Sequence, residues 1–426
     1  MIHRMNGMAL LLGLAAAAVC SAAEPADRDP LLTGCRDALL AQFAQLESAL
    51  PEMTRSADAA AARLLGGGRL FAAGQAGFVN EARGRAGGLM MLAGLDAKTA
   101  LSEKDVLLVG ALTNADSAAE NACRRGKEAG AYVVLFSPAF EEPTPPIAAL
   151  CAAHVVNFAP AVPLEVAAIT AEGAAEERRA VAASSLFNMS ALWTWTGELI
   201  GSLTRKGKMP VVWQSIMLQG SKERNAKYFV EGDSSKRRFH EDLSVPAQPE
   251  GRIGRLYLDA LRRQVRGLRG AALEQLAAAA GLMADCVRGG GAVHVESVSH
   301  YTIYDIDLPG LPAWAKHPKR YPEPEEIAAA MKPGDVYFEI GYMELRLPFL
   351  EAAARAGGKS VVALCHAPPT PLDGPQPAML MDAQWEYGDA AVLLPGYDVE
   401  ILPTSAVLQT ALFRAVLAKA EALAAK

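Results

Sequence analysis

The chain has 426 residues, of which 51% are hydrophobic and 21% are charged, and its formal net charge is -6. This composition is typical of a globular protein that is long enough for two domains. It argues against a nucleic-acid partner, because binding to a phosphate backbone requires an excess of Lys and Arg. After the first two dozen residues, no apolar run is long enough to predict a membrane span.

The first 23 residues have the pattern of a secretory signal peptide. Arg4 precedes an apolar run from Met8 to Val19, and the small residues Ser21–Ala23 follow it as a cleavage site. The apolar run is too short to cross a bilayer. We therefore expect an exported protein, with the periplasm as its compartment. If translation instead starts near Pro30, the protein is cytoplasmic.

Five cysteines remain after this segment, namely Cys35, Cys123, Cys151, Cys286 and Cys365. An odd number without paired spacing argues against a disulfide framework, and no CxxC or His/Cys group has the spacing of metal ligands. We expect the cysteines to act as small buried hydrophobic residues. No metal site and no cofactor is predicted.

The first half of the chain alternates between helical and strand patterns. Helices are predicted over Thr33–Leu65, Phe78–Leu92 and Glu176–Leu203, and strands over Arg69–Ala73, Val106–Ala111 and His154–Phe158. The strand Val106–Ala111 is a continuous apolar run, which is typical of a strand buried on both faces of a parallel sheet. Gly130 ends the helix that follows it.

The second half repeats this order. Met331–Cys365 matches Leu101–Ser137 as strand, loop, helix, glycine and strand. A helix over Ile253–Val287 and a strand over Ala292–Val295 precede it, and the segment around Val392 resembles the one around His154. The repeat predicts an α/β fold with two doubly wound, mainly parallel sheets flanked by helices. Any ligand is expected at the carboxyl ends of the strands.

The predicted organisation is a signal peptide at 1–23, a first domain at 24–205, an inter-domain connection at 206–252 and a second domain at 253–426. The connection lacks helical or strand periodicity, and it is longer than a simple linker requires. Connections of this length are often functional. In the second half, the Pro- and aromatic-rich loop Asp307–Pro324 has a composition that could fold over a ligand.

Two motifs resemble the sugar isomerase (SIS) family, whose α/β modules bind phosphosugars. The run GQAGFVNEARGRAGGLM at Gly74–Met90 is similar to the glycine loop, helix glutamate and RAGGL run of a bacterial branch of that family. The run LPTSAVLQTALFRAVLAKA from Leu402 is similar to the closing helix of arabinose-phosphate isomerase relatives. The resemblance covers most of the chain except the connection. It implies a tandem SIS protein with a small-molecule sugar or sugar derivative as its ligand.

SIS proteins bind phosphate at a Ser/Thr-rich loop that leads into a helix, where free N–H groups and the helix dipole attract an anion. The corresponding loops here are Leu112–Ser117 and Gly341–Glu344. Hydrogen-bond donors remain in the first of these loops, at Thr113, Asn114 and Ser117.

Both loops also carry a carboxylate, Asp116 in the first and Glu344 in the second. Such a group gains roughly 0.3–1 kcal/mol from the helix dipole. It repels a phosphate by about 4 kcal/mol per pair of unit charges at about 4 Å in an effective dielectric of about 20. We therefore expect the second loop not to hold phosphate. Asp116 and Glu344 would instead bind the hydroxyl or amino groups of a neutral or amino sugar.

Three residues are candidates for acid–base catalysis. The resemblance places Glu81 near an open-chain sugar, as the base that moves a proton between neighbouring carbons, and such a base needs a pKa raised by partial burial. The alternative is an ion pair between Glu81 and Arg85, one helical turn away. His300, or His240 in the FHEDL segment of the connection, would be the acid. A structural histidine and a solvated charge run are the alternatives for these two.

Other ligand contacts are expected where strands end, at Gly74, Gln75, Ser297, Ser299 and Thr302. Hydroxyl groups at these places can bind sugar or phosphate oxygens, although helix capping explains Ser299 equally well. Three tryptophans can stack on a sugar face or pack in the core, namely Trp213, Trp314 and Trp385.

The sequence therefore predicts a carbohydrate-derivative-binding protein of the SIS type, with metal-free aldose–ketose isomerisation as the catalytic interpretation. An exported solute-binding receptor and a non-catalytic structural or regulatory protein are the alternatives. A receptor chain crosses between its lobes two or three times, whereas a tandem SIS chain crosses once, through the connection. The sequence leaves a homo-oligomer open.

Overall fold

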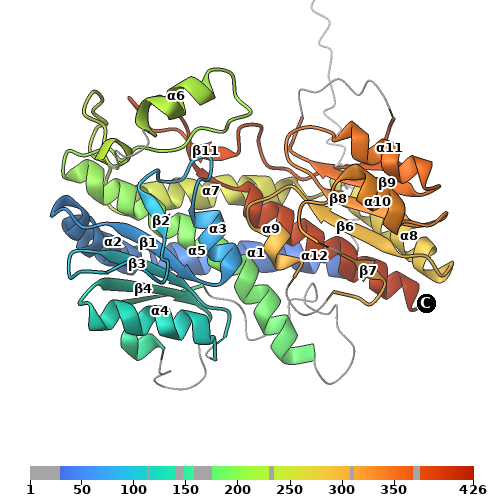
Figure 1. Ribbon diagram of the computed structural model, residues 1–426, viewed down its shortest axis with the longest axis horizontal. Helices are drawn as coiled ribbons and strands as arrows, with labels where there is room; N and C mark the ends of the chain where they lie inside the picture. Colours follow the sequence, from blue (N-terminus) through green and yellow to red (C-terminus); the bar gives the residue numbers. More distant parts are fainter. Residues whose placement is uncertain are drawn as a thin grey trace, which may run out of the picture.

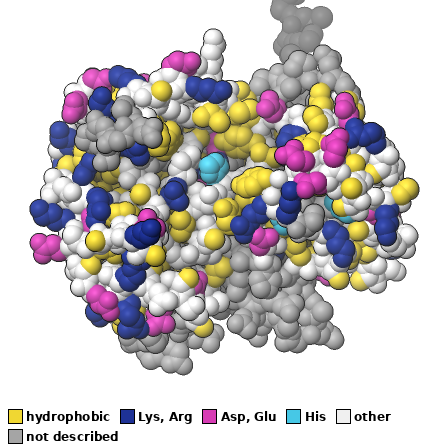
Figure 2. Space-filling model, in the orientation of Figure 1, with side chains coloured by type: hydrophobic (Ala, Val, Ile, Leu, Met, Phe, Trp, Pro, Cys, Tyr) yellow, Lys and Arg dark blue, Asp and Glu magenta, His cyan; other side chains and the backbone are white. Residues whose placement is uncertain are grey.

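The structure is a computed structural model that describes residues 29–113, 115–139, 147–157, 175–229, 235–307, 311–317, 319–367 and 375–426. The predicted signal peptide and Asn114 lie outside these residues. Two five-stranded parallel sheets stand at opposite ends of the molecule, and long helices lie between them (Figure 1). Acidic and basic side chains are interspersed over the face shown in Figure 2, so this face carries no basic patch.

The first sheet has the strand order β2-β1-β3-β4-β5. Its strands are β1 (Leu70–Gly74), β2 (Leu92–Gly94), β3 (Val106–Gly110), β4 (Tyr132–Ser137) and β5 (Ala153–Val156). Helix α4 (Ser117–Glu128) covers one face, and α2 (Leu50–Leu65), α3 (Ala76–Ala82) and α5 (Ala175–Arg205) cover the other. Both faces are therefore buried, which explains the continuous apolar run of β3.

The second sheet has the order β10-β9-β8-β6-β7. Its strands are β6 (Val293–Ser297), β7 (Ala315–Lys316), β8 (Val336–Ile340), β9 (Lys359–Leu364) and β10 (Met379–Asp382). On one face lie α10 (Pro324–Ala330) and α11 (Leu347–Arg355), and on the other lie α8 (Ala271–Arg288) and α9 (Thr302–Asp305). Numbered from its own first strand, each sheet has the order 2-1-3-4-5. The predicted α/β fold class is confirmed.

Each sheet takes its strands from one continuous part of the chain, β1 to β5 and then β6 to β10. Within the described strands, the chain therefore passes from one sheet to the other once. This connectivity differs from the two or three crossings expected of a solute-binding receptor. No helix in the described part of the chain carries an apolar stretch long enough to cross a membrane.

Helices α1 (Pro30–Ser48), α7 (Arg252–Gly267) and α12 (Ser405–Ala424) join α5 between the two sheets (Figure 1). Helix α1 packs mainly on α7 and α12, although α2 follows it directly in the sequence. One hydrophobic cluster contains residues of both sheets and of all four of these helices. The two halves therefore share a core.

Two helices predicted as continuous are each divided into two. Thr33–Leu65 breaks at Ala49, because Pro51 in the first turn of α2 has no N–H to continue a preceding helix. Ile253–Val287 forms α7 and α8, which are separated at Gly270, where φ is 51°. The prediction of a helix over Phe78–Leu92 was wrong beyond Ala82. Glycines with positive φ end the helix there, and the chain continues in extended form towards β2.

The segment around Val392 is not the counterpart of β5. It forms β11 (Ala390–Val392), which pairs antiparallel with β12 (Ile401–Pro403) in a separate two-stranded sheet. The place of β5 in the second sheet is taken by β10. The connection, predicted without regular structure, contains α6 (Ser221–Tyr228) and isolated bridges from Val212 to Leu89 and from Pro210 to Phe239.

Helix α7 receives its N-terminal cap from another helix. Its own cap residue, Gly251, has no side chain that could accept a hydrogen bond. The buried carboxylate of Glu198, on α5, accepts hydrogen bonds from the backbone N–H groups of Gly251 and Gly254, both at 2.9 Å. It also accepts one from Thr54 Oγ1, on α2, at 2.6 Å. This carboxylate therefore joins three helices of the shared core.

We expect Glu198→Ala to lower the free energy of unfolding by roughly 1–3 kcal/mol, because two buried N–H groups lose their acceptor. Glu198→Gln keeps one acceptor oxygen and should lose less. Denaturant unfolding measures both, with Glu120→Ala on the exposed surface of α4 as the control, for which a change within about 0.5 kcal/mol is expected. Equal losses in the Ala and Gln variants would contradict the capping role.

Candidate functional site

The loops at the carboxyl ends of β1 and β6 meet at the boundary between the halves. Gly74 ends β1 with a φ of +89°, and a Cβ atom there would lie 2.2 Å from the carbonyl oxygen of Gly110, so only glycine fits. On α3, a Cβ atom at Gly77 would lie 3.0 Å from the ring of Tyr301. Asn80 Nδ2 donates a hydrogen bond to the carbonyl oxygen of His300 at 2.5 Å. Helix α3 and the β6–α9 loop are therefore in direct contact.

Next to this contact, Arg85 lies between two buried carboxylates, one from each half. Its Nε is 3.1 Å from Glu81 Oε1 and its Nη2 is 2.5 Å from Asp389 Oδ2, and the three side chains are 2%, 0% and 0% exposed. Arg85 also donates to Ser405 Oγ, and Tyr342 OH donates to Asp389 Oδ2 at 2.9 Å. The ion pair weighed as the alternative for Glu81 is therefore present. It is part of a buried cluster that joins the halves.

The environment of Glu81 raises the pKa of its carboxyl group to near neutral pH. Burial raises the pKa of Glu81 to about 7, and the charge of Asp389 acts in the same direction, while Arg85 and Trp193 lower it. Oε1 accepts a hydrogen bond from Trp193 Nε1 at 3.1 Å. Oε2 is buried and has no hydrogen-bond partner among the residues described. A carboxyl group in this state can both take up and release a proton near pH 7.

His300 is half-buried within the electrostatic field of the same cluster. Desolvation lowers its pKa to about 4, and the charge of Arg85 acts in the same direction. The imidazole is therefore neutral at pH 7. In this form it can donate a hydrogen bond to a carbonyl oxygen but does not carry an acidic imidazolium proton.

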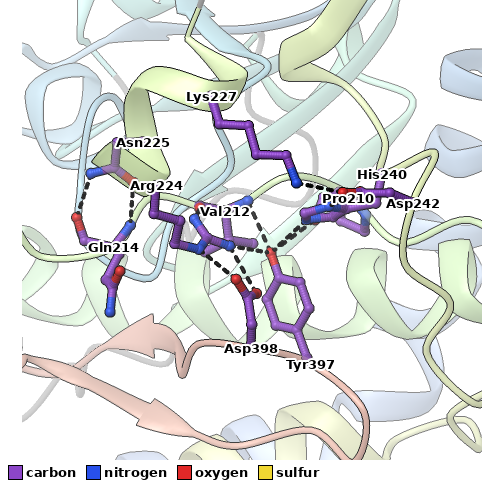
Figure 3. A network of polar contacts seen from close by, with 10 residues as sticks. All are labelled: Pro210, Val212, Gln214, Arg224, Asn225, Lys227, His240, Asp242, Tyr397 and Asp398. Atoms are coloured by element: carbon purple, nitrogen blue, oxygen red, sulfur yellow. Dashed lines mark hydrogen bonds and ion pairs between the residues drawn. The ribbon is translucent and has the colours of Figure 1, made fainter. Parts of the chain in front are cut away.

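His240 belongs to a different network, shown in Figure 3, which joins the connection to the segment after β11. Its Nε2 is 3.2 Å from Tyr397 OH, and its Nδ1 is 3.5 Å from Asp242 Oδ1. Arg224 pairs with Asp398 in the same network at 2.7 Å. Burial lowers the pKa of His240. No described contact joins His240 to Glu81 or to Arg85, whereas the charges of Arg85 and Asp389 act on His300.

The hydroxyl groups predicted as ligand contacts after β6 are buried and bonded within the protein. Ser297 Oγ and Ser299 Oγ are 2.9 Å apart, and Ser299 Oγ accepts a hydrogen bond from the N–H of Ile303 at 3.0 Å. Thr302 Oγ1 is 2.9 Å from Thr410 Oγ1, on α12. These contacts match the capping interpretation of Ser299 and stabilise α9.

The residues predicted as ligand contacts in the first half lie on the loops before α3 and α4 and, for Ser117, at the first residue of α4. Gln75 Oε1 caps α3 by accepting a hydrogen bond from the N–H of Phe78, and Asp116 Oδ1 caps α4 by accepting one from the N–H of Ala119 at 3.0 Å. Thr113 is half-buried and Ser117 is exposed. In the other half, Glu344 is exposed as well. The structure therefore gives Asp116 a role in the local fold.

The three candidate tryptophans are placed in different surroundings. Trp385 is fully buried and stacks on Tyr342, with their ring centroids 4.8 Å apart. Trp213 is half-buried against Phe229, at 4.9 Å, and Trp314 packs at the edge of the core. Core packing is therefore the role of Trp385.

The second sheet has a polar face that was not predicted from the sequence. In the first sheet, four side chains face α4 and belong to one hydrophobic cluster, namely Phe71, Ala73, Leu107 and Val109. Because strand order and register are shared, their counterparts are His294, Glu296, Tyr337 and Glu339. The sequence did contain a signal for this polar face, because a glutamate stands within each of the apolar runs VHVES and VYFEI.

Within this face, Glu296 and Glu339 are directly opposite each other on neighbouring strands. Arg346 Nη2 lies 3.0 Å from Glu339 Oε2 and 3.8 Å from Glu296 Oε1. Both carboxyl oxygens of Glu296 lack a hydrogen-bond partner in the described part of the chain. Burial raises the pKa of Glu296 to about 8, so its carboxyl group is protonated at neutral pH.

Two cavities lie elsewhere in the second half. One of about 360 Å³ is at the carboxyl ends of β9 and β10, where His366 and Gln384 line it, and one of about 510 Å³ is at the amino ends of β6 and β8, where His317 and Lys332 line it. Neither cavity is lined by Glu81 or His300. Within the described ranges, no three His, Cys, Asp or Glu side chains are grouped in a way that could hold a metal ion.

No protein-family model matches the chain, and no curated protein sequence matches it. One similar solved structure is a protein from Silicibacter pomeroyi DSS-3, provisionally called a phosphosugar isomerase, with 12% identity and a TM-score of 0.41 over 92% of this chain and 97% of that chain. Another is a protein from Salmonella typhimurium LT2, provisionally called a sugar binding protein, with 12% identity and a TM-score of 0.45 over 92% of this chain and 98% of that chain. At these values the fold assignment rests on the strand order and register of this chain itself.

Proposed function

We propose that the protein binds a sugar or sugar derivative, in the manner of an SIS protein, where α3 meets the β6–α9 loop. The observation that carries the proposal is the direct contact between the loops at the carboxyl ends of β1 and β6, which Asn80 and His300 make. Ligands of parallel α/β sheets bind at the carboxyl ends of the strands. The resemblance of Gly74–Met90 to the SIS family supports the choice of ligand class.

We also propose aldose–ketose isomerisation as the reaction of this site, because Glu81 has the properties of its base. With a pKa of about 7, and with Oε2 lacking a hydrogen-bond partner among the described residues, Glu81 can remove the C2 proton of an open-chain aldose. While the enediol exists, the proton on Glu81 can exchange with solvent. Glu81 then returns a proton to C1, and the C1 oxygen gains a proton as the C2 hydroxyl group loses one, which gives the ketose. Neutral His300 would donate a hydrogen bond to the sugar carbonyl oxygen. Because Glu81 is enclosed, the β6–α9 loop has to move away from α3 to admit the sugar.

The ligand class follows from the loops before α4 and α11. A protein exported to the periplasm meets neutral and amino sugars rather than the phosphosugars of the cytoplasm. Exposed Glu344 and the half-buried cap residue Asp116 are acceptors for hydroxyl or ammonium groups. We therefore expect neutral or amino sugars to bind more tightly than the corresponding sugar phosphates.

A thermal-shift panel of neutral sugars, amino sugars and sugar phosphates tests binding. The best ligand then enters an exchange assay in deuterated solvent. The wild type is expected to exchange the C2 proton, and Glu81→Gln is expected to abolish exchange while the ligand still raises the melting temperature. Glu120→Gln, an exposed change on α4, serves as the control.

Undiminished exchange in Glu81→Gln would exclude Glu81 as the base. A melting temperature that no member of the panel changes would favour a non-catalytic structural or regulatory protein.

A further inference from the structure

Two cysteines that are far apart in the sequence bring their sulfur atoms together. Cys123 lies on the buried side of α4, and Cys151 follows the short 3-10 helix Ala148–Leu150, just before β5. Their Sγ atoms are 3.4 Å apart, and both are free thiols. The spacing of the cysteines in the sequence gave no sign of this pair.

The backbones that carry the two thiols are both fixed to the first sheet. Cys123 belongs to the hydrophobic cluster between α4 and the sheet, and half-buried Cys151 packs against the same cluster. Because a disulfide has a sulfur–sulfur distance of about 2.05 Å, the sulfurs have to approach by only about 1.4 Å. Rotation of the two side chains can supply a movement of this size.

We propose that Cys123 and Cys151 are a site of disulfide formation, for which a small-molecule disulfide is a sufficient oxidant. The thiolate of half-buried Cys151 attacks the reagent, forms a mixed disulfide and releases one reagent thiolate. The thiolate of Cys123 then attacks Sγ of Cys151, forms the Cys123–Cys151 bond and releases the second reagent thiolate. The protein loses two electrons and two protons, and the reagent gains them as two thiols.

The second of these steps is expected to be the slow one. The hydrogen bond with Cys151 and burial both raise the pKa of Cys123, and the carboxylates of Asp116 and Glu120 act in the same direction. Few Cys123 thiolates are therefore present near pH 7, and crosslinking should become faster as pH rises. At neutral pH the mixed disulfide at Cys151 should accumulate before the crosslink.

The crosslink would hold α4 against the start of β5. Helix α4 begins at Ser117, the last residue of the predicted phosphate loop, so the bond also fixes the helix end to which this loop leads. An oxidising compartment such as the periplasm favours the bond, whereas the cytoplasm keeps the thiols reduced. The inference does not depend on the proposed function, because it concerns only these two sulfur atoms.

The test treats the purified full-length chain with oxidised glutathione at pH 8 and compares it with the chain in dithiothreitol. We expect an intact mass lower by two hydrogen atoms and a peptide map that joins Cys123 to Cys151. The melting temperature should rise by several degrees and return to its original value on reduction. Cys286→Ser, which changes a buried thiol elsewhere, should leave all three results unchanged.

Cys151→Ser and Cys123→Ser should each abolish the crosslink. If Cys123→Ser does not fold, Cys151→Ser, at the half-buried position, is the deciding variant. A wild type that stops at the glutathione adduct, or a link that maps to other cysteines, would overturn the proposal. A mapped link without a rise in melting temperature would overturn its stabilising role.

Discussion

Replacement of Arg85 by Met is expected to lower the free energy of unfolding by about 3–5 kcal/mol. The guanidinium group lies between the carboxylates of Glu81 and Asp389, and these side chains are almost completely removed from solvent. Its loss leaves two buried carboxyl groups without a countercharge. Tyr342 still donates a hydrogen bond to Asp389, but a neutral hydroxyl group cannot replace the positive charge.

Denaturant unfolding measures this effect, and the surface of α4 offers a matched control. Arg124 pairs with Glu120 at the same i,i+4 spacing, but their side chains are 53% and 41% exposed, so Arg124→Met should change stability by less than about 1 kcal/mol. Adding Glu81→Gln and Asp389→Asn to Arg85→Met should recover part of the loss, because no buried charge is then left unpaired. A loss as small as that of the control would show that the buried cluster contributes little to stability.

An increase of pH from 6.5 to 9 is expected to lower the stability of the wild type, and Glu296→Gln is expected to remove most of this decrease. The folded protein keeps a proton on Glu296 up to about pH 8, whereas the carboxyl group ordinarily releases it near pH 4.5. Between these values folding takes up a proton, so stability falls as pH rises, by about 1.4 kcal/mol per pH unit. At pH 9 the variant should therefore exceed the wild type by about 2–4 kcal/mol more than it does at pH 5.

Other titrating side chains determine the pH range in which the effect of Glu296 is best measured. Glu81, with a pKa of about 7, adds to the decrease below that pH. The pKa of His366 is raised by its hydrogen bond to Asp382, which adds a further decrease above its ordinary value. His300 acts in the opposite direction, because its lowered pKa makes stability rise with pH between about 4 and 6.5. In the range from pH 6.5 to 8, the change in stability therefore reports the groups whose pKa is raised, without the opposite contribution of His300.

Thermal or denaturant unfolding over this pH range gives the slope for each variant. Glu325→Gln is a suitable control, because its side chain is 77% exposed and pairs with Arg355 at the surface. The control should keep the slope of the wild type. If Glu296→Gln keeps it as well, Glu296 is not the group responsible.

The fold could be predicted from the sequence where the local pattern determines the structure. The apolar run at Val106–Ala111 corresponds to β3, and the duplicated pattern corresponds to two sheets of equal strand order. The prediction failed where long-range pairing decides. The segments around His154 and Val392 are alike in sequence, but only the first belongs to a five-stranded sheet, because the second finds an antiparallel partner in β12.

The same limit applies to the candidate site. The i,i+4 spacing of Glu81 and Arg85 indicated their ion pair, which forms although the helix ends at Ala82 and Arg85 lies in the segment after it. Asp389 could not be found in this way, because it comes from the other half of the chain and only tertiary packing brings it to Arg85. The contact between Cys123 and Cys151 has the same origin. Glu296 and Glu339 are different, because a carboxylate within a buried strand run is itself a signal.

The position of α1 has a consequence for the order in which the chain can fold during synthesis. Its apolar side chains Leu39, Phe43 and Leu46 are buried in the shared core, where α1 packs on α7 and α12. Arg262 of α7 pairs with Glu47, at the carboxyl end of α1, at 2.6 Å. Because α12 leaves the ribosome after nearly all of the chain, this apolar surface stays uncovered for most of translation.

A nascent chain that ends after the first sheet therefore exposes the apolar surface of α1 to solvent and to other chains. We therefore expect that the two halves do not fold as independent units. A first half made alone should aggregate or require a chaperone. Supplying the second half as a separate polypeptide in the same cell should rescue its solubility, because α7 and α12 can then cover α1.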